Sequence, residues 1–195
     1  MVDPALEDPL APARWTAEQY LRLVDEGVLG PDDRVELLEG VIVSMAPQNV
    51  PHAAGVTRAI RYLTMALGER AVVRPQLSFI AGKYSVPEPD VAVIAGSLDD
   101  NDRAHPRDAL LVVEVSDSSL RQDRMTKAPM YAAANLPEFW IVNLRDGCVE
   151  VRREPEPKNR RYRSVAIRRR GDSIEPVALP GVRIAVDDLL PGGVG

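Results

Sequence analysis

The sequence predicts an α/β fold in which a central mixed β-sheet is covered by helices on both faces. Two segments, Val91–Ile94 and Leu110–Val113, are apolar at every position, which is typical of strands in the middle of a covered sheet. Helical and strand patterns alternate along the chain, which favours layers of helix and sheet. With 195 residues, of which 45% are hydrophobic, the chain is long enough for one substantial core.

The N-terminal part divides into an arm and a first helix. Residues 1–14 are rich in Pro, Ala and acidic side chains and are expected to be a flexible arm, with residues 15–195 forming a single domain. The helix is expected after Trp15, because Thr16 followed three residues later by Gln19 is a capping-box pattern. It is expected to end near the first glycines that follow it, Gly27 and Gly30.

The remaining elements follow from periodicity and turn residues. Helical spacing predicts a second helix over residues 51–68, and a third is expected over residues 120–134. Strands are expected at residues 35–38, 41–45, 72–80, 91–94, 110–115, 139–142, 149–153 and 162–167, with a short terminal strand and turn within 180–190. The pair at 149–153 and 162–167 is predicted to be an exposed, additional C-terminal β-hairpin.

Composition limits the class of protein. No apolar run approaches the roughly 20 residues that a membrane helix needs, and the first residues lack the pattern of a secretory signal. Cys148 is the only cysteine, so no intramolecular disulfide can form and a cytoplasmic location is expected. The net charge of −5 is not typical of a general DNA-binding protein.

One segment of the chain is strongly basic. Residues 152–170 contain nine Lys and Arg residues and only two acidic ones, Glu154 and Glu156. Such a segment can contact phosphates, because Lys and Arg displace the counterions condensed on nucleic acids. It is also compatible with a solvated hairpin that carries long charged side chains.

Glu114 is the first candidate for chemistry. In a strand, residues two apart share a face, so Glu114 continues the apolar stripe of Leu110 and Val112. A carboxylate in such a position loses solvent and normally pairs with a cation or binds a metal. The alternative is that the strand ends here and Glu114 reaches water or caps the next helix.

Asp90 and Lys127 are the next candidates. Asp90 follows Pro89 at the start of a strand, where proline is tolerated, although a Pro-Asp pair is also common in turns. Lys127 lies four residues from both Asp123 and Tyr131, so all three share one helix face. Lys127 can orient a water or stabilise charge on a phosphate, or it can form an exposed pair with Asp123.

Three further polar residues complete the candidate set. Glu36 is polar among apolar neighbours, whereas Glu39 falls at the turn and is expected to face solvent. His52 lies in the first turn of the second helix, where a structural role is expected more than a ligand role. Carboxylates as the main donors indicate Mg²⁺ or Mn²⁺ rather than zinc. The sequence lacks a Walker A motif, a Gly-x-Gly-x-x-Gly motif and a Gly-x-Ser-x-Gly motif.

Taken in order, these residues resemble a known family. The segments are Val35-Glu-Leu-Leu-Glu-Gly40 followed by His52, Pro89-Asp90-Val-Ala-Val, Leu111-Val-Val-Glu-Val-Ser116, Asp123-x-x-x-Lys127-x-x-x-Tyr131, and Glu138-Phe-Trp-Ile-Val142. Their order and spacing resemble the Uma-type family of putative bacterial restriction endonucleases, within the PD-(D/E)XK nuclease superfamily. The resemblance covers about residues 15–153 and implies a restriction-endonuclease-like α/β core.

The resemblance also implies roles for individual residues. Asp90, Glu114 and Glu36 would bind the metal, with the backbone carbonyl of Val115 as a further ligand. The superfamily's usual Glu-x-Lys reads Glu114-Val-Ser116 here. Ser116 therefore stands in the place of the lysine, and Lys127 on the following helix would supply the ammonium instead.

The function expected from this pattern is Mg²⁺- or Mn²⁺-dependent hydrolysis of DNA phosphodiester bonds. A non-catalytic module that binds nucleic acid or protein remains an alternative, as does an enzyme acting on a smaller phosphoester. A homodimer is a further hypothesis, because two-fold symmetry suits the cutting of two antiparallel strands.

Overall fold

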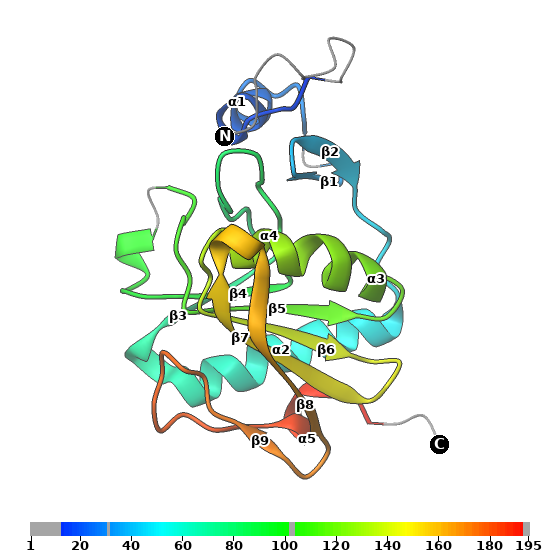
Figure 1. The fold of residues 1–195 in the computed structure, drawn as a ribbon, viewed down its shortest axis with the longest axis vertical. Coiled ribbons are helices and arrows are strands. Elements are labelled where there is room, and N and C mark those ends of the chain that lie inside the picture. Colours follow the sequence, from blue (N-terminus) through cyan, green and yellow to red (C-terminus); the bar gives the residue numbers. More distant parts are fainter. Residues whose placement is uncertain (1–12, 31, 102–103, 193–195) are drawn as a thin grey trace.

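The fold is built around a six-stranded mixed sheet (Figure 1). We describe it from a computed structural model, which covers residues 13–30, 32–101 and 104–192. The strand order is β3-β4-β5-β6-β7-β8, and all neighbours are antiparallel except β5 and β6, which are parallel. The strands are β3 (Val72–Pro75), β4 (Val91–Ile94), β5 (Leu111–Ser116), β6 (Glu138–Asn143), β7 (Cys148–Glu156) and β8 (Arg161–Arg169). The predicted mixed sheet is confirmed.

Helices cover both faces of this sheet. On one face lies α2 (Val50–Leu67), together with the C-terminal segment that contains β9 (Ser173–Ile174), β10 (Ile184–Ala185) and α5 (Val186–Leu189). On the other face lie α3 (Leu120–Gln122) and α4 (Ala128–Ala133) (Figure 1). Single turns are η2 (Gly68–Arg70), η3 (Asp99–Asn101) and η5 (Pro157–Asn159).

The central strands are buried on both faces, as their apolar sequences predict. Every residue of β4, β5 and β6 is buried. Alternation divides β5 between the two layers, so Val113 and Val115 pack against α2 while Val112 packs on the side of α4. Glu114 shares the face of Val112, and its carboxylate is therefore directed toward the helix that carries Lys127.

The second helix begins and ends where the sequence places its signals. The Asn49 side chain caps α2 by accepting a hydrogen bond from the backbone N–H of His52 at 3.0 Å. The buried residues of α2 form one stripe: Gly55, Val56, Ala59, Leu63 and Leu67. The helix ends at Gly68, whose φ of 53° is a conformation that favours glycine.

The third predicted helix is interrupted by a wider turn. Residues Asp123–Lys127 form a π-helical turn, η4, between α3 and α4, in which the N–H of Ala128 bonds to the carbonyl of Asp123. Pro129 explains the interruption, because it has no N–H for the carbonyl of Met125 and its ring would collide with that carbonyl in a regular helix. The uninterrupted helix expected over 120–134 is therefore wrong in this turn.

A small N-terminal lobe lies beside the main sheet. It consists of α1 (Ala17–Asp25), the antiparallel pair β1 (Val35–Leu38) and β2 (Val41–Ser44), and residues 80–86 (Figure 1). The predicted capping box of Thr16 and Gln19 is present. Tyr20, Leu37, Ile80 and Val86 form a hydrophobic cluster separate from the two clusters that line the sheet. We call this unit the N-terminal lobe.

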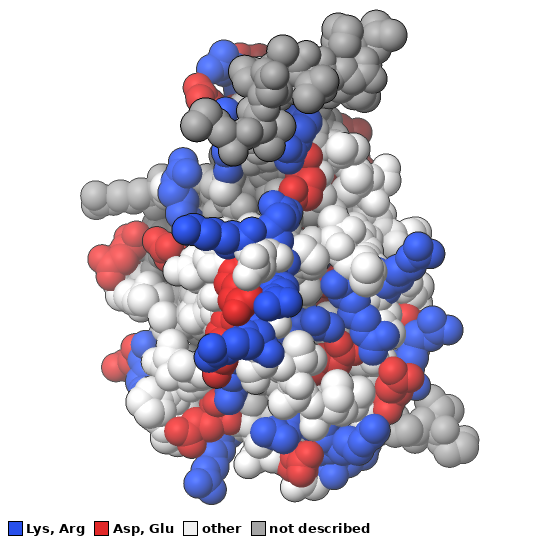
Figure 2. All heavy atoms as spheres, in the orientation of Figure 1, with Lys and Arg blue, Asp and Glu red and all other residues white. Residues whose placement is uncertain are grey.

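The β7–β8 hairpin is only partly exposed. The antiparallel pair predicted over 149–153 and 162–167 is confirmed, but the first four residues of β7 are buried, so the predicted exposure is wrong at the base of the hairpin. Arginines of the basic segment are mostly paired with carboxylates: Arg152 with Glu150, Arg153 with Glu138, Arg160 with Glu39, Arg161 with Glu156, Arg163 with Glu154, and Arg170 with Asp187. Figure 2 shows positive and negative side chains interspersed on this face. The solvated hairpin therefore fits this segment better than a continuous phosphate-binding strip.

The third strand of the prediction is shorter in the structure. The strand predicted over 72–80 ends at Pro75, because proline cannot continue the ladder and Gln76 turns with a φ of 48°.

Residues 1–12 of the predicted flexible arm lie outside the described residues. Within the described ranges, no helix has both the length and the apolarity to cross a membrane.

Candidate active site

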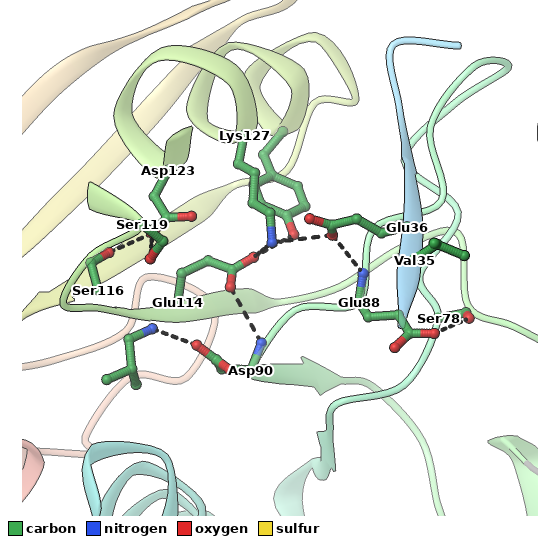
Figure 3. Close-up of polar contacts among 12 residues, drawn as sticks. Val35, Glu36, Ser78, Glu88, Asp90, Glu114, Ser116, Ser119, Asp123 and Lys127 are labelled. Atoms are coloured by element: carbon green, nitrogen blue, oxygen red, sulfur yellow. Dashed lines mark hydrogen bonds and ion pairs between the residues drawn. The ribbon is translucent and has the colours of Figure 1, made fainter. Parts of the chain in front are cut away.

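Four predicted side chains meet where the N-terminal lobe contacts the sheet (Figure 3). Glu36 comes from β1, Asp90 from the residue before β4, Glu114 from β5, and Lys127 from the end of the π-helical turn. All four are buried, with exposed fractions between 2% and 7%. Ionisable groups this poorly solvated require partners, so their mutual contacts define the chemistry of the site.

Lys127 joins the lobe to the sheet. Its Nζ lies 3.2 Å from Glu36 Oε2 and 3.0 Å from Glu114 Oε1. A lysine ammonium carries three N–H donors, so one remains after these two contacts. The predicted proximity of Lys127 to the carboxylates is present in the structure.

Glu114 is held mainly through one of its two oxygens. Its Oε1 accepts the Lys127 ammonium and also the phenol of Tyr131, whose OH lies 3.1 Å away. Its Oε2 has a longer contact of 3.4 Å with the backbone N–H of Asp90. The carboxylate is therefore oriented from the helix side, and Oε2 faces Asp90.

Asp90 is fixed in a comparable way. Its Oδ2 accepts the backbone N–H of Val115 at 2.7 Å and lies 3.1 Å from His52 Nε2. The structure thus places Val115 beside Asp90 through its N–H, while its carbonyl as a metal ligand stays a prediction. His52 is an active-site neighbour as well as a residue of the first turn of α2, which sequence reasoning regarded mainly as structural.

The donor set fits a hard divalent cation. Glu36 resembles Asp90 and Glu114 in that it accepts a backbone N–H: its Oε2 lies 3.2 Å from the backbone nitrogen of Glu88. Glu36 Oε1 and Asp90 Oδ1 accept no hydrogen bond from the residues that the structure describes, and Glu114 Oε2 has only its long contact. Mg²⁺ and Mn²⁺ prefer such carboxylate oxygens. In the described ranges, no three His, Cys, Asp or Glu side chains are already spaced to hold a metal ion. Metal binding therefore requires the side chains of the cluster to move closer to one position.

The pKa shifts of the clustered side chains also favour a site for a divalent cation. Burial raises the pKa of Glu114 well above its ordinary value; Lys127 opposes this rise, and Asp123, Asp90 and Glu36 add to it. Burial alone would lower the pKa of Lys127, but Glu114 and Glu36 outweigh it, so the ammonium stays protonated. The hydrogen bond to Asp90 raises the pKa of His52. A divalent cation would offset the excess of buried negative charge.

Ser116, which stands in the usual place of the lysine, has a structural partner. Its Oγ donates to Asp123 Oδ2 at 2.6 Å, and Ser119 Oγ donates to the same oxygen at 2.8 Å. Asp123 is 2% exposed, so an exposed pair between Asp123 and Lys127 is wrong. The serines instead fix the first residue of the π-helical turn whose last residue is Lys127.

Other residues of the site were not singled out from the sequence. For Tyr131 the sequence gives a spacing of four from Lys127 and a place in the segment that carries the resemblance, but no role. Glu88 is half-buried and contacts both Ser78 and Glu36, and no sequence pattern indicated it. Glu39 lies at the β1–β2 turn and pairs with Arg160, outside the carboxylate cluster.

A pocket opens beside the cluster. Its volume is about 670 Å³, and it lies between the N-terminal lobe and the sheet. Its lining includes the carboxylates and Lys127, residues from α1 and the segment after β2, and residues that follow β3 and β5. The volume is in the range of small-molecule and cofactor sites.

Comparisons with known proteins concern the family and the fold of the chain. A family model described as "Uma2: Putative restriction endonuclease" matches residues 17–187. Among solved structures, the chain is similar to a putative nuclease belonging to DUF820 from Anabaena variabilis, with a TM-score of 0.71 and 15% identity over 91% of this chain and 97% of that chain. At this identity the likeness concerns the fold. The search of curated proteins finds no match.

Proposed function

The chain belongs to the Uma2 family of putative restriction endonucleases, and from this premise we propose that it is a metal-dependent endonuclease acting on DNA. The family supports a nuclease role, and the buried carboxylates supply the particular chemistry. The observation that carries the proposal is that Glu36 and Glu114 both contact the Lys127 ammonium, while Asp90 lies next to Glu114, with its backbone N–H 3.4 Å from Glu114 Oε2.

In this proposal Asp90, Glu114 and Glu36 hold Mg²⁺ or Mn²⁺, with the carbonyl of Val115 as a further ligand. A divalent cation at such a site lowers the pKa of a water and neutralises charge on the phosphate. Lys127 keeps Glu36 and Glu114 in place with two N–H groups and directs the third toward the attacking water or a phosphate oxygen. Tyr131 holds the Glu114 carboxylate in orientation.

The test is the conversion of supercoiled plasmid to nicked or linear forms with Mg²⁺, Mn²⁺ or EDTA. We expect metal-dependent cleavage by the wild type and loss of cleavage in Glu114→Gln and Lys127→Met. Glu154→Gln, which changes an exposed carboxylate on β7, serves as the matched control and should cleave normally. Folded wild-type protein that cleaves with neither metal would contradict the proposal and favour a non-catalytic binding module.

A second measurement separates metal binding from cleavage. A cation that binds only the folded protein raises its melting temperature as concentration increases. We expect Mg²⁺ to stabilise the wild type and the Glu154→Gln control, but not Asp90→Asn. Equal stabilisation of Asp90→Asn would place the metal elsewhere.

The homodimer stays a prediction. Sedimentation equilibrium across a range of protein concentrations tests it, and a monomeric mass throughout would remove the two-fold model.

A further inference from the structure

Two chemically different kinds of side chain line the pocket beside the carboxylates. One kind is the charged cluster that contains Glu114 and Lys127. The other kind, which we call the apolar wall, comprises apolar side chains from the N-terminal lobe and the segment after it: Val24, Leu29, Met45 and Pro47. Val24 is 42% exposed although it is apolar, so the wall offers surface that a ligand can cover. An occupant that fills the whole pocket must combine an anionic end with an apolar body.

The polar groups near the apolar wall also suit a particular occupant. Gln48 and Gln76 line the same pocket, and their amides can both donate and accept hydrogen bonds. A nucleobase has apolar faces and an edge of donors and acceptors, and it is joined through a sugar to a phosphate. A single nucleotide therefore matches the aliphatic wall, the amides and the cation-binding carboxylates in one molecule.

The charge of the pocket favours an occupant that brings few phosphates into it. Seven carboxylates are among its lining residues, whereas Arg34 and Lys127 are its only lysine or arginine side chains in the described ranges. Proteins that hold several phosphates of a DNA, in one strand or two, usually neutralise them with Lys and Arg. The arginines of the β7–β8 hairpin do not supply this surface, because most are already paired with carboxylates.

Base stacking distinguishes an unpaired strand from an intact duplex. In a duplex, the faces of each base are covered by its neighbours and its pairing edge is occupied. A base can reach the wall formed by Val24 and Pro47 only when it is unpaired and turned out of the stack. We propose that the pocket accepts an unpaired nucleotide, so that the substrate is single-stranded or locally unpaired DNA. This inference rests on the proposed nuclease function and names its substrate class.

The experiment compares three fluorescein-labelled DNAs of the same sequence: a single strand, a full duplex and a duplex with an unpaired bubble. Binding is measured by fluorescence anisotropy with Ca²⁺, and cleavage is measured separately with Mg²⁺. We expect tighter binding and faster cleavage of the single strand and the bubble, with cleavage of the bubble at its unpaired nucleotides. Binding of the full duplex as tightly as the single strand would overturn the inference.

Two matched variants test the apolar wall. Val24→Asn changes a side chain that lines the pocket, and Val28→Asn makes the same change four residues later, at a side chain that is 62% exposed and outside the lining. We expect Val24→Asn to weaken single-strand binding roughly threefold to tenfold, and Val28→Asn to leave it unchanged. Equal binding by both variants would remove the wall from the site.

The outcomes distinguish this inference from the proposed function. Cleavage that favours intact duplex would leave the nuclease proposal in place and refute the unpaired-nucleotide site. Preferential binding of the single strand through Val24, without cleavage by either metal, would support the pocket assignment and contradict the nuclease.

Discussion

Tyr131→Phe removes one hydroxyl and leaves the surrounding packing almost unchanged. The phenol donates to Glu114 Oε1 at 3.1 Å, and the ring packs against Phe139 with centroids 5.0 Å apart. Burial raises the pKa of Tyr131 well above its ordinary value, so the hydroxyl keeps its proton and remains a donor. The substitution therefore isolates the hydrogen bond that orients the carboxylate.

The expected magnitude follows from the partners of Glu114. A hydrogen bond to a charged group contributes about 1.5–3 kcal/mol. Lys127 remains 3.0 Å from the same oxygen after the substitution, so that oxygen keeps a donor and the loss falls near about 1.5 kcal/mol. For a chain of this length, about 1 kcal/mol corresponds to a shift of roughly 2–4 °C in Tm, so we expect a decrease of about 3–6 °C.

The chain offers a matched control for this substitution. Tyr162 is also buried and donates to a backbone carbonyl, that of Leu136 at 3.0 Å, away from the carboxylates. Tyr162→Phe should lower Tm by about 2–4 °C and leave plasmid cleavage unchanged. Tyr131→Phe should lower both Tm and the cleavage rate, the latter about tenfold if about 1.4 kcal/mol of transition-state stabilisation is lost. Equal cleavage by the two folded variants would refute the positioning role of Tyr131.

Three further predictions concern the surroundings of the site. Lys127→Met leaves buried carboxylates without their ammonium and should destabilise the metal-free protein by about 3–5 kcal/mol in urea unfolding; a loss below about 1 kcal/mol would indicate a weak, solvated pair. Gly55→Ala places a Cβ 2.7 Å from Val115 Cγ1, so it should destabilise by about 1–3 kcal/mol despite its better helix propensity, and Val115→Ala should cost less stability in the Gly55→Ala protein than in the wild type. Burial alone would raise the pKa of Glu150, but its hydrogen bonds with Arg124 and Arg152 lower this pKa overall. The stability it contributes is therefore present above its ordinary pKa and is lost as pH falls below that value, so Glu150→Gln should flatten the acid side of a plot of unfolding free energy against pH.

Much of the sheet and its site could be predicted because local rules and tertiary packing agree there. Glu114 interrupts an apolar stripe, and its face could be assigned from the alternation of β5. Lys127 could be placed on the side of Tyr131 from their spacing of four. The strand period of two and the helical spacing of four depend only on backbone geometry, so both are present in the folded protein.

Other features depend on contacts that the sequence does not display. The π-helical turn had a visible signal in Pro129, but its position depends also on the serines that hold Asp123. The burial at the base of the hairpin arises because Val149 and Val151 belong to the hydrophobic cluster that also contains residues of α2 and the C-terminal segment. Local polarity indicates exposure only where no distant segment packs on the strand.

The two-segment construction of the N-terminal lobe has a consequence for folding kinetics. Its β1 strand joins the later part of the lobe through the bridge between Leu37 and Val86, so a long stretch of chain must close into a loop before the lobe is complete. Contacts so distant in sequence slow folding. Asp90, Glu114 and Lys127 belong to the sheet and its covering helix, whereas Glu36 arrives with the lobe. We therefore expect the sheet to form first during refolding, with Glu36 not yet in the carboxylate cluster. The ability of the site to bind metal should then appear last.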